Sequence, residues 1–159
     1  LMFAAAGGLL ATLALLAILR LPITAALAQA AIVLMLSAWG VKLAWWRVAG
    51  MAPQAGSIES ATGLGALGAV RPLMPPHTEE NYLQHEMGFV VARKHADKLR
   101  IIALALGGGL PVLILLLAPA SAGALAVAVL AHVAGMFVER WLFFAEAKHV
   151  VTLYYGEAA

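Results

Sequence analysis

Four long apolar stretches dominate the hydropathy pattern of this chain. They cover residues 1–19, 23–46, 99–117 and 120–155. About 20 mostly apolar residues are needed to cross the hydrocarbon core of a bilayer, so each stretch predicts a membrane-spanning helix. Only a few residues separate the first stretch from the second and the third from the fourth. The pattern therefore predicts an all-α membrane protein with four transmembrane helices in two antiparallel hairpins.

Prolines, glycines and one charge mark irregular points along these helices. Pro22 suits the first turn of the second helix, where its missing N–H is tolerated. Lys42 lies near the end of the same helix and is expected to snorkel towards the membrane surface. In the third helix, Gly107–Gly109 and Pro111 resemble the broken helices on which transporters build substrate sites. A transporter or permease fragment is therefore an alternative interpretation.

The segment between the hairpins, residues 47–98, has a different character. It is rich in Gly and Pro over residues 50–76, and a helix is expected over about residues 78–98. Six basic and five acidic residues lie between Arg47 and Arg100. A long polar segment of balanced charge at a membrane face favours a docking surface. An amphipathic helix lying on the membrane is the alternative.

Composition supports the membrane assignment and excludes several kinds of chemistry. The 159 residues are 64% hydrophobic and 11% charged, whereas soluble domains are about half apolar and a quarter charged. The chain has no cysteine, so it can supply no disulfide, thiolate metal site or iron–sulfur cluster. The formal net charge of +2 points to no nucleic-acid partner. Because the chain begins at Leu1 within an apolar run, we expect it to be part of a longer protein. A cleavable signal peptide is a weaker alternative, since no basic segment precedes this run.

Charge asymmetry predicts the orientation. Most Lys and Arg residues fall on the side of segment 47–98 and the C-terminus, whereas Arg20 falls on the other side. The positive-inside rule therefore places that segment and the C-terminus in the cytoplasm.

Ionisable residues in the fourth helix are the strongest candidates for a functional site. His132, Glu139 and Glu146 are spaced by seven and share one stripe of the helix, with Arg140 beside it. Such residues are costly at membrane depth and indicate function. They are candidates to contact quinone or a partner subunit. Alternatively, His132 is a core histidine bonded to a backbone carbonyl, and the Glu139–Arg140 pair anchors the interface against residues 93–100.

Other cofactor and catalytic sites are not expected in this chain. A membrane haem needs two axial ligands, and His132 has no second histidine at its depth, because His149 lies roughly 25 Å further along the same helix. The spacings of His77, His85 and His95 place them on no common helical face, which argues against a metal site. No catalytic arrangement of nucleophile, base and acid is recognisable, so the chain is not expected to be an enzyme by itself.

Two regions carry a family resemblance. The C-terminal run ERWLFFAEAKHVVTLYYG, residues 139–156, resembles that of the membrane-anchor subunits of dimethyl sulfoxide reductase-type molybdoenzymes, as does the middle segment. The motifs in that segment are ATGLG at 61–65, VRPL at 70–73, PPHT at 75–78, NYL at 81–83 and EMGF at 86–89. The branch most similar to this chain is the anchor of the cytoplasmic sulfite-oxidising enzyme.

The resemblance implies a three-subunit complex in the bacterial inner membrane. A molybdopterin catalytic subunit and an iron–sulfur subunit would dock on the anchor, which binds a quinone (menaquinone or ubiquinone) and holds no haem. Anchors of this type usually have eight helices, so the four expected here would be the C-terminal half. The quinone contacts are then expected at His132, Glu139, Arg140 and Glu146. The partner-docking candidates are Arg71, His77, Glu86, Arg93 and Lys94. A purely structural tether remains a further alternative.

Overall fold

The computed structural model describes residues 1–51, 56–71, 73, 94–118 and 120–146. Within these ranges every regular element is helical and no strand is present, which confirms the all-α prediction. The elements are α1 (Met2–Ile18), α2 (Ala25–Met51), α3 (Ile58–Thr62), the short 3-10 helix η1 (Gly65–Leu67), α6 (Ala96–Leu104), the π-helical turn η2 (Ala105–Gly109), α7 (Leu110–Leu117) and α8 (Ala122–Ala145).

Three of the helices are long and apolar enough to cross a membrane. They are α2 over Ala25–Ala49, the continuous run of α6, η2 and α7 over Ala96–Leu117, and α8 over Ala122–Ala145. The first helix is equally apolar but shorter, with 17 residues. Length and composition therefore allow three of these helices to span a membrane, and the fourth span stays a prediction.

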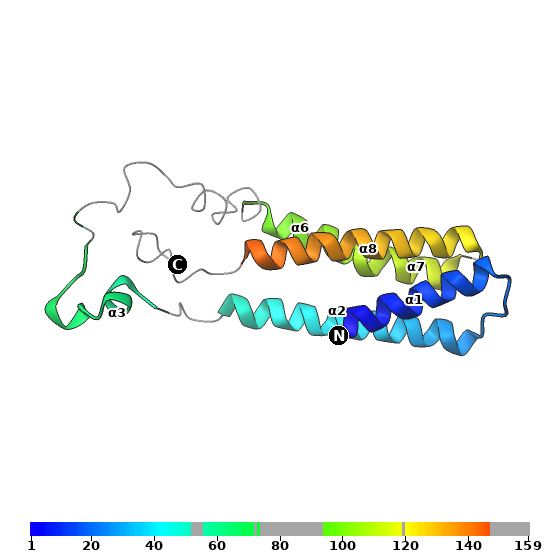
Figure 1. The fold of residues 1–159 in the computed structure, drawn as a ribbon, viewed down its shortest axis with the longest axis horizontal. Coiled ribbons are helices and arrows are strands. Elements are labelled where there is room, and N and C mark those ends of the chain that lie inside the picture. Colours follow the sequence, from blue (N-terminus) through cyan, green and yellow to red (C-terminus); the bar gives the residue numbers. More distant parts are fainter. Residues whose placement is uncertain (52–55, 72, 74–93, 119, 147–159) are drawn as a thin grey trace.

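The long helices form two hairpins that lie side by side (Figure 1). The α1–α2 and α7–α8 connections lie at the same end of the bundle, here called the link end. The opposite end, where α2 and α8 finish and α6 begins, is called the loop end. The last helix, α8, packs against α1, α6, η2 and α7, whereas α2 packs mainly against α1.

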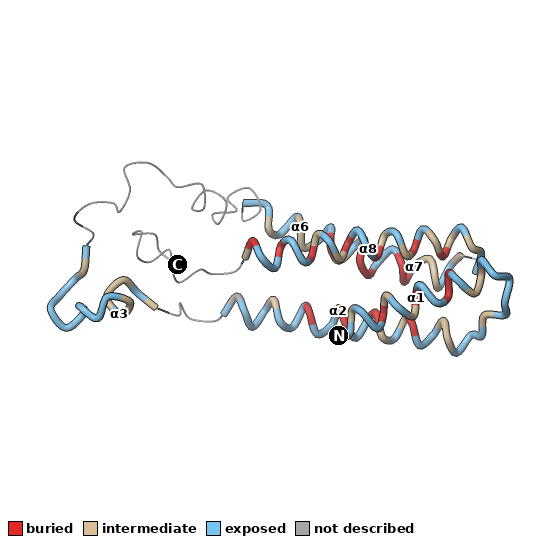
Figure 2. The backbone as a smooth tube through the Cα atoms, in the orientation of Figure 1, coloured by how far each residue is buried: buried red, intermediate tan, exposed pale blue. Residues whose placement is uncertain are grey.

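Small and medium apolar side chains fill the space between the helices. Leu10, Met35 and Ala128 are fully buried there, together with Trp39. Figure 2 shows the buried residues on the inward faces of the helices, whereas the outward faces are exposed. Those outward faces carry large apolar side chains such as Leu130 and Phe137. An apolar exterior of this kind is what contact with lipid requires and what a soluble protein avoids.

The turn between α1 and α2 corrects one prediction. The Arg20 and Leu21 N–H groups donate to the carbonyls of Ala17 and Leu16, a Schellman turn that places Arg20 at a φ of 56°. The second helix then begins at Ala25 and not at Pro22, because the Thr24 hydroxyl accepts the Leu27 N–H at 3.3 Å and acts as the N-terminal cap. Pro22 therefore lies before the helix, and its predicted place in the first turn is wrong.

Other helix boundaries also shift. The third predicted span begins earlier, at Ala96, so its first residues had been assigned to the polar segment. It also passes through its glycines without a break, because they form η2. The last helix is described over Ala122–Ala145, with Glu146 as its C-terminal cap, and its predicted continuation to residue 155 lies outside the described residues. Residues 147–159 and most of the predicted helix over 78–98 lie outside the described residues.

Candidate functional site

An ion pair connects α2 and α8 near the loop end. The Glu139 carboxylate in α8 is 1% exposed, and it pairs with the Lys42 ammonium from α2, which is 8% exposed. On its other oxygen it accepts a hydrogen bond of 2.5 Å from Arg140 Nε. Lys42 lies where a lysine can snorkel, and in the structure its side chain is buried against Glu139. A buried carboxylate opposite it gives the ammonium an ionic partner inside the bundle, which is favoured over an unpaired charge at membrane depth.

Aromatic rings surround the Lys42 ammonium. Its nitrogen lies 4.2 Å from the Trp45 ring centre, 5.3 Å from that of Trp46 and 5.5 Å from that of Phe143. These distances are within the range of cation–π attraction, which strengthens as water is excluded. The Arg140 guanidinium lies 5.3 Å from the Phe143 ring and is half exposed. Of the three charged groups, Arg140 is thus the one that faces outward.

A second ionic network joins the start of α6 to the end of α8. One terminal nitrogen of Arg100 donates to Glu146 at 2.6 Å, and the other donates to Asp97 at 3.0 Å. The Arg100 guanidinium also lies 5.7 Å from the Trp46 ring of α2. Arg100, which belongs to the third span, therefore contacts the end of α8 and the Trp46 ring of α2 at the loop end.

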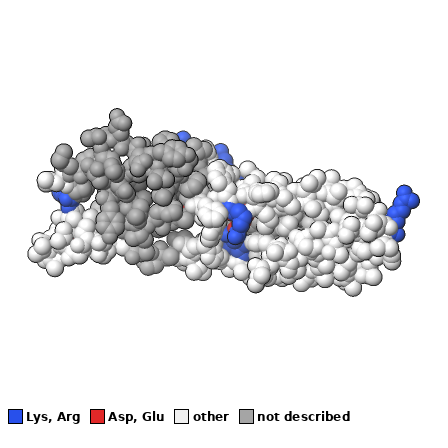
Figure 3. Space-filling view, in the orientation of Figure 1, with Lys and Arg blue, Asp and Glu red and all other residues white. Residues whose placement is uncertain are grey.

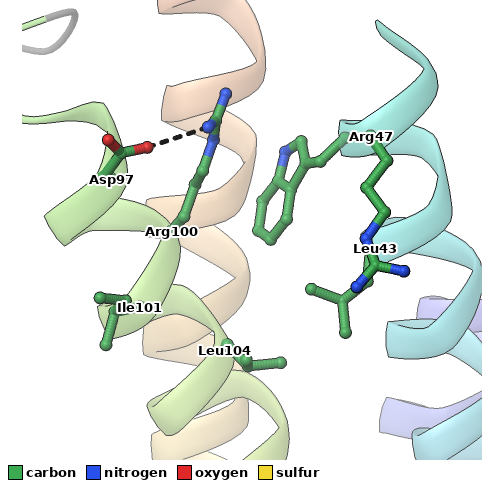
Figure 4. Close-up of a pocket in the computed structure, with 7 residues that line it drawn as sticks. Leu43, Arg47, Asp97, Arg100, Ile101 and Leu104 are labelled. Carbon is green, nitrogen blue, oxygen red and sulfur yellow. Dashed lines mark hydrogen bonds and ion pairs between the residues drawn. The ribbon is translucent and has the colours of Figure 1, made fainter. Parts of the chain in front are cut away.

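An open groove of about 410 Å³ lies between α2 and α6 at this end (Figure 4). Its α2 wall is formed by Leu43, Trp46 and Arg47, and its α6 wall by Asp97, Arg100, Ile101 and Leu104. Near its own N-terminus α1 packs against α2 through Phe3 and Trp39, whose ring centres are 5.0 Å apart. The groove lies beyond this contact, where long polar side chains bridge α2 and its neighbours.

His132 occupies the interior of the bundle, away from the groove. It is buried, and its Nδ1 lies 2.6 Å from the Gly107 carbonyl oxygen. Its Nε2 faces α1, since a Cβ built on Gly7 would lie 2.9 Å from this atom. The alternative interpretation, a core histidine bonded to a backbone carbonyl, describes this geometry. A contact between His132 and quinone stays a prediction.

The π-helical turn is closely packed on two sides. A Cβ built on Gly108 would lie 2.6 Å from Trp39 Nε1, and one built on Gly107 would lie 2.9 Å from Met136 Cε. The backbone of Gly107 also meets Gly135 of α8 directly. The glycines that resembled a transporter's broken helix therefore leave space on the helix surface, which the Trp39 and Met136 side chains fill. Trp39 Nε1 is buried there and has no hydrogen-bond partner among the residues that the structure describes.

The predicted stripe on the fourth helix is real, and its residues divide into two groups. His132 and Glu139 lie on the inward face of α8, and Glu146 caps its end. The structure brings Glu139 and Arg140 together, and Glu139 also pairs with Lys42; neither forms an ion pair with residues 94–100, the described part of the segment in the alternative interpretation. Glu146 is the residue that contacts that segment, through Arg100.

The docking candidates are only partly described. Arg71 and Lys94 are exposed, whereas His77, Glu86 and Arg93 lie outside the described residues. Within the described ranges no three His, Asp or Glu side chains gather where they could hold a metal ion.

Sequence reasoning missed Lys42, Arg47, Trp46 and Arg100 as members of the site. One signal was available for Lys42. It is the lone charged residue between Ala25 and Trp46, and a charge within a span calls for a partner on another helix. The sequence contains no comparable signal for the groove, because the existence of the groove depends on the distance between α2 and α6.

Charge is confined to the ends of the bundle. In the view of Figure 3, a basic cluster with some acidic surface marks the loop end and one basic side chain marks the link end, with uncharged surface between them. The bundle is thus polar where α2, α6 and α8 carry their ionic groups and apolar along its length.

Comparison of the chain with protein-family models, with curated proteins and with solved structures found no match.

Proposed function

We propose that this chain is a membrane-anchor subunit of a molybdopterin oxidoreductase complex, which exchanges electrons between quinone and an iron–sulfur partner subunit. The proposal includes four membrane spans, with the loop end facing the cytoplasm. The spanning helices and the resemblance of residues 139–156 to such anchors support it. The observation that carries it is the cluster of Lys42, Glu139 and Arg140 among aromatic rings at one end of the spans.

The chemistry of this cluster fits a quinone. Quinone reduction consumes two electrons and two protons, and its ring carbonyls accept hydrogen bonds. Arg140 presents a half-exposed guanidinium beside the Phe143 ring, which suits a carbonyl oxygen and a flat headgroup. Glu139, directly bonded to Arg140, is a carboxyl group that can take up or release a proton.

The polar loop end also suits a partner that brings electrons. Lys94 is exposed at the start of the third span, and Arg71 is exposed in the polar segment. An iron–sulfur subunit docked on this side would approach the cluster without crossing the apolar part of the bundle. The cluster would then lie between the partner's nearest metal centre and the lipid that contains the quinone.

Subunit composition is the first test. The full-length tagged protein, extracted in mild detergent, is affinity-purified and the co-purifying proteins are identified by mass spectrometry. The proposal expects one molybdopterin subunit and one ferredoxin-like subunit in fixed stoichiometry. A preparation that is intact and monodisperse but carries neither subunit would overturn the proposal.

Quinone coupling is the second test. In the assembled complex, Arg140→Ala and Glu139→Gln are expected to lower quinone-coupled turnover by about tenfold or more, as expected for loss of a hydrogen bond to a charged group. Turnover with a soluble dye that accepts or donates electrons at the catalytic subunit should be unchanged. Glu59→Gln, which alters a partly exposed acid in α3, is the control. Unchanged quinone-coupled turnover in both variants would show that the cluster is not the quinone contact.

A further inference from the structure

The α2–α6 groove has an apolar lower part and a charged upper part. Leu43, Ile101 and Leu104 form the lower part and are partly or largely exposed. Arg47, Asp97 and Arg100 form the upper part. The spanning windows end at Ala49 in α2 and begin at Ala96 in α6, so the charged part lies at the level where a bilayer meets water. The groove is therefore amphipathic in the same direction as a phospholipid.

The two guanidinium groups in the groove differ in how they are used. Arg100 is held by two carboxylates, those of Asp97 and Glu146. Arg47 forms no ion pair with any residue that the structure describes. Arg47 lines the groove, and in Figure 4 its side chain runs back along α2. A cation with no ionic partner among the described residues, on a groove with both charged and apolar walls, is suited to a phosphate at the depth of a lipid headgroup.

The balance of charge around the groove selects among phospholipids. Arg47 and Arg100 carry two positive charges, which the carboxylates of Asp97 and Glu146 offset. A lipid with a net negative headgroup would gain little from these four offset charges and would meet the Asp97 carboxylate, whose side chain is 90% exposed. A zwitterionic headgroup instead finds a cation for its phosphate and an anion for its ammonium group.

We propose that this groove is a binding site for phosphatidylethanolamine. The phosphate binds Arg47, the ammonium group lies towards Asp97, and the acyl chains run down over Leu43 and Ile101. Trp46 also lines the groove, and tryptophan is common at headgroup level. The volume of about 410 Å³ lies within the usual range for small-molecule sites. The lipid site does not depend on the proposed electron transfer.

Native mass spectrometry of the full-length protein in mild detergent tests the proposal. After delipidation, phosphatidylethanolamine, phosphatidylglycerol or inorganic phosphate is added, and the bound fraction is measured as a function of concentration. We expect wild type to bind phosphatidylethanolamine in preference to phosphatidylglycerol. Arg47→Ala should weaken this binding about tenfold, as expected for loss of one charge-assisted hydrogen bond. Arg20→Ala, which removes an exposed arginine at the link end, is the matched control and should bind as wild type does.

Arg47 is exposed, so its replacement is expected to leave the fold intact, and an unchanged unfolding transition would verify this. Arg47→Lys should retain most of the binding, because the positive charge remains. Equal binding of phosphatidylethanolamine by wild type and Arg47→Ala would overturn the proposal. A preference for phosphatidylglycerol, or displacement of the lipid by inorganic phosphate, would also overturn it. Displacement by a short-chain quinone would assign the groove to quinone instead.

Discussion

Gly135 is the point at which α8 comes closest to the third span, and replacing it with alanine tests the packing of the bundle. A Cβ built there would lie 2.9 Å from the Leu106 carbonyl carbon and closer still to the nitrogen and Cα of Gly107. Real Cβ atoms essentially never approach other atoms within 3.0 Å. The obstructing atoms belong to the backbone, so no side-chain rotation can make room. The two helices must therefore separate locally.

The expected size of the effect follows from these contacts. Forcing an extra methyl group into a packed site typically costs about 1–3 kcal/mol. The separation also stretches the 2.6 Å contact between His132 and the Gly107 carbonyl, which is worth roughly another 0.5–1.5 kcal/mol. The better helix propensity of alanine offsets about 1 kcal/mol. We therefore expect Gly135→Ala to lower the free energy of unfolding by about 1–3 kcal/mol.

Gly123 provides the control within the same helix, because a Cβ built there meets nothing within 4 Å. Gly123→Ala should be neutral or stabilise the protein by up to about 1 kcal/mol. Both variants are compared with wild type by reversible unfolding in mixed micelles, followed by circular dichroism and tryptophan fluorescence. If Gly135→Ala is as stable as Gly123→Ala, the close approach of α8 to the π-helical turn is refuted.

Two further predictions concern charged groups. Lys42→Met should destabilise the protein by about 3–5 kcal/mol, because it leaves the buried Glu139 carboxylate without its α2 partner. The double variant Lys42→Met/Glu139→Leu should recover most of that loss. The same unfolding assay measures both variants, and a double variant no more stable than the single one would contradict this account. In helix α3, the Glu59 carboxylate accepts a hydrogen bond from the backbone N–H of Glu59 itself and a second one from the Ser57 hydroxyl. These bonds, the first more than the second, hold the pKa of Glu59 below its usual 4.5. Ionised Glu59 therefore favours folded α3 above its unfolded pKa, and this contribution is lost as the pH falls through the lower, folded pKa. Ser57→Ala should raise the pKa of Glu59, and carboxyl-carbon NMR titration of the protein would detect no change if the Ser57 hydroxyl makes no such bond.

The features that depend on local pattern were predictable from the sequence. Apolar runs located the helices because burial in lipid requires an uninterrupted stretch of apolar residues, which is visible without knowing any partner. The seven-residue spacing of His132 and Glu139 placed them on one face of α8, since helical geometry alone decides this. The predicted helix ends were less accurate, because several neighbouring residues can serve as the first residue or the cap of a helix. Thr24 replaced Pro22 as the start of α2 through one hydrogen bond.

The features that depend on contacts between helices could not be predicted in the same way. The choice of Lys42 as the partner of Glu139 requires the relative depth and rotation of α2 and α8. The same holds for Arg100, which reaches Glu146 because α6 begins beside the end of α8. Contacts of Glu139 and Arg140 with the 93–100 segment were a reasonable alternative from sequence. In the structure, Glu146, which lies seven residues after Glu139, contacts that segment through Arg100.

The π-helical turn has a consequence for the phase of the third span. An α-helix advances about 100° per residue, and one widened turn amounts to one inserted residue in that count. The faces of α6 and α7 are therefore offset from those of an uninterrupted helix. In this way Arg100 can point to the ionic network while Val112, further along, points to the core. Removing one residue from Ala105–Gly109 would restore a regular helix, and it would also turn one half of the span away from the partners that it now has.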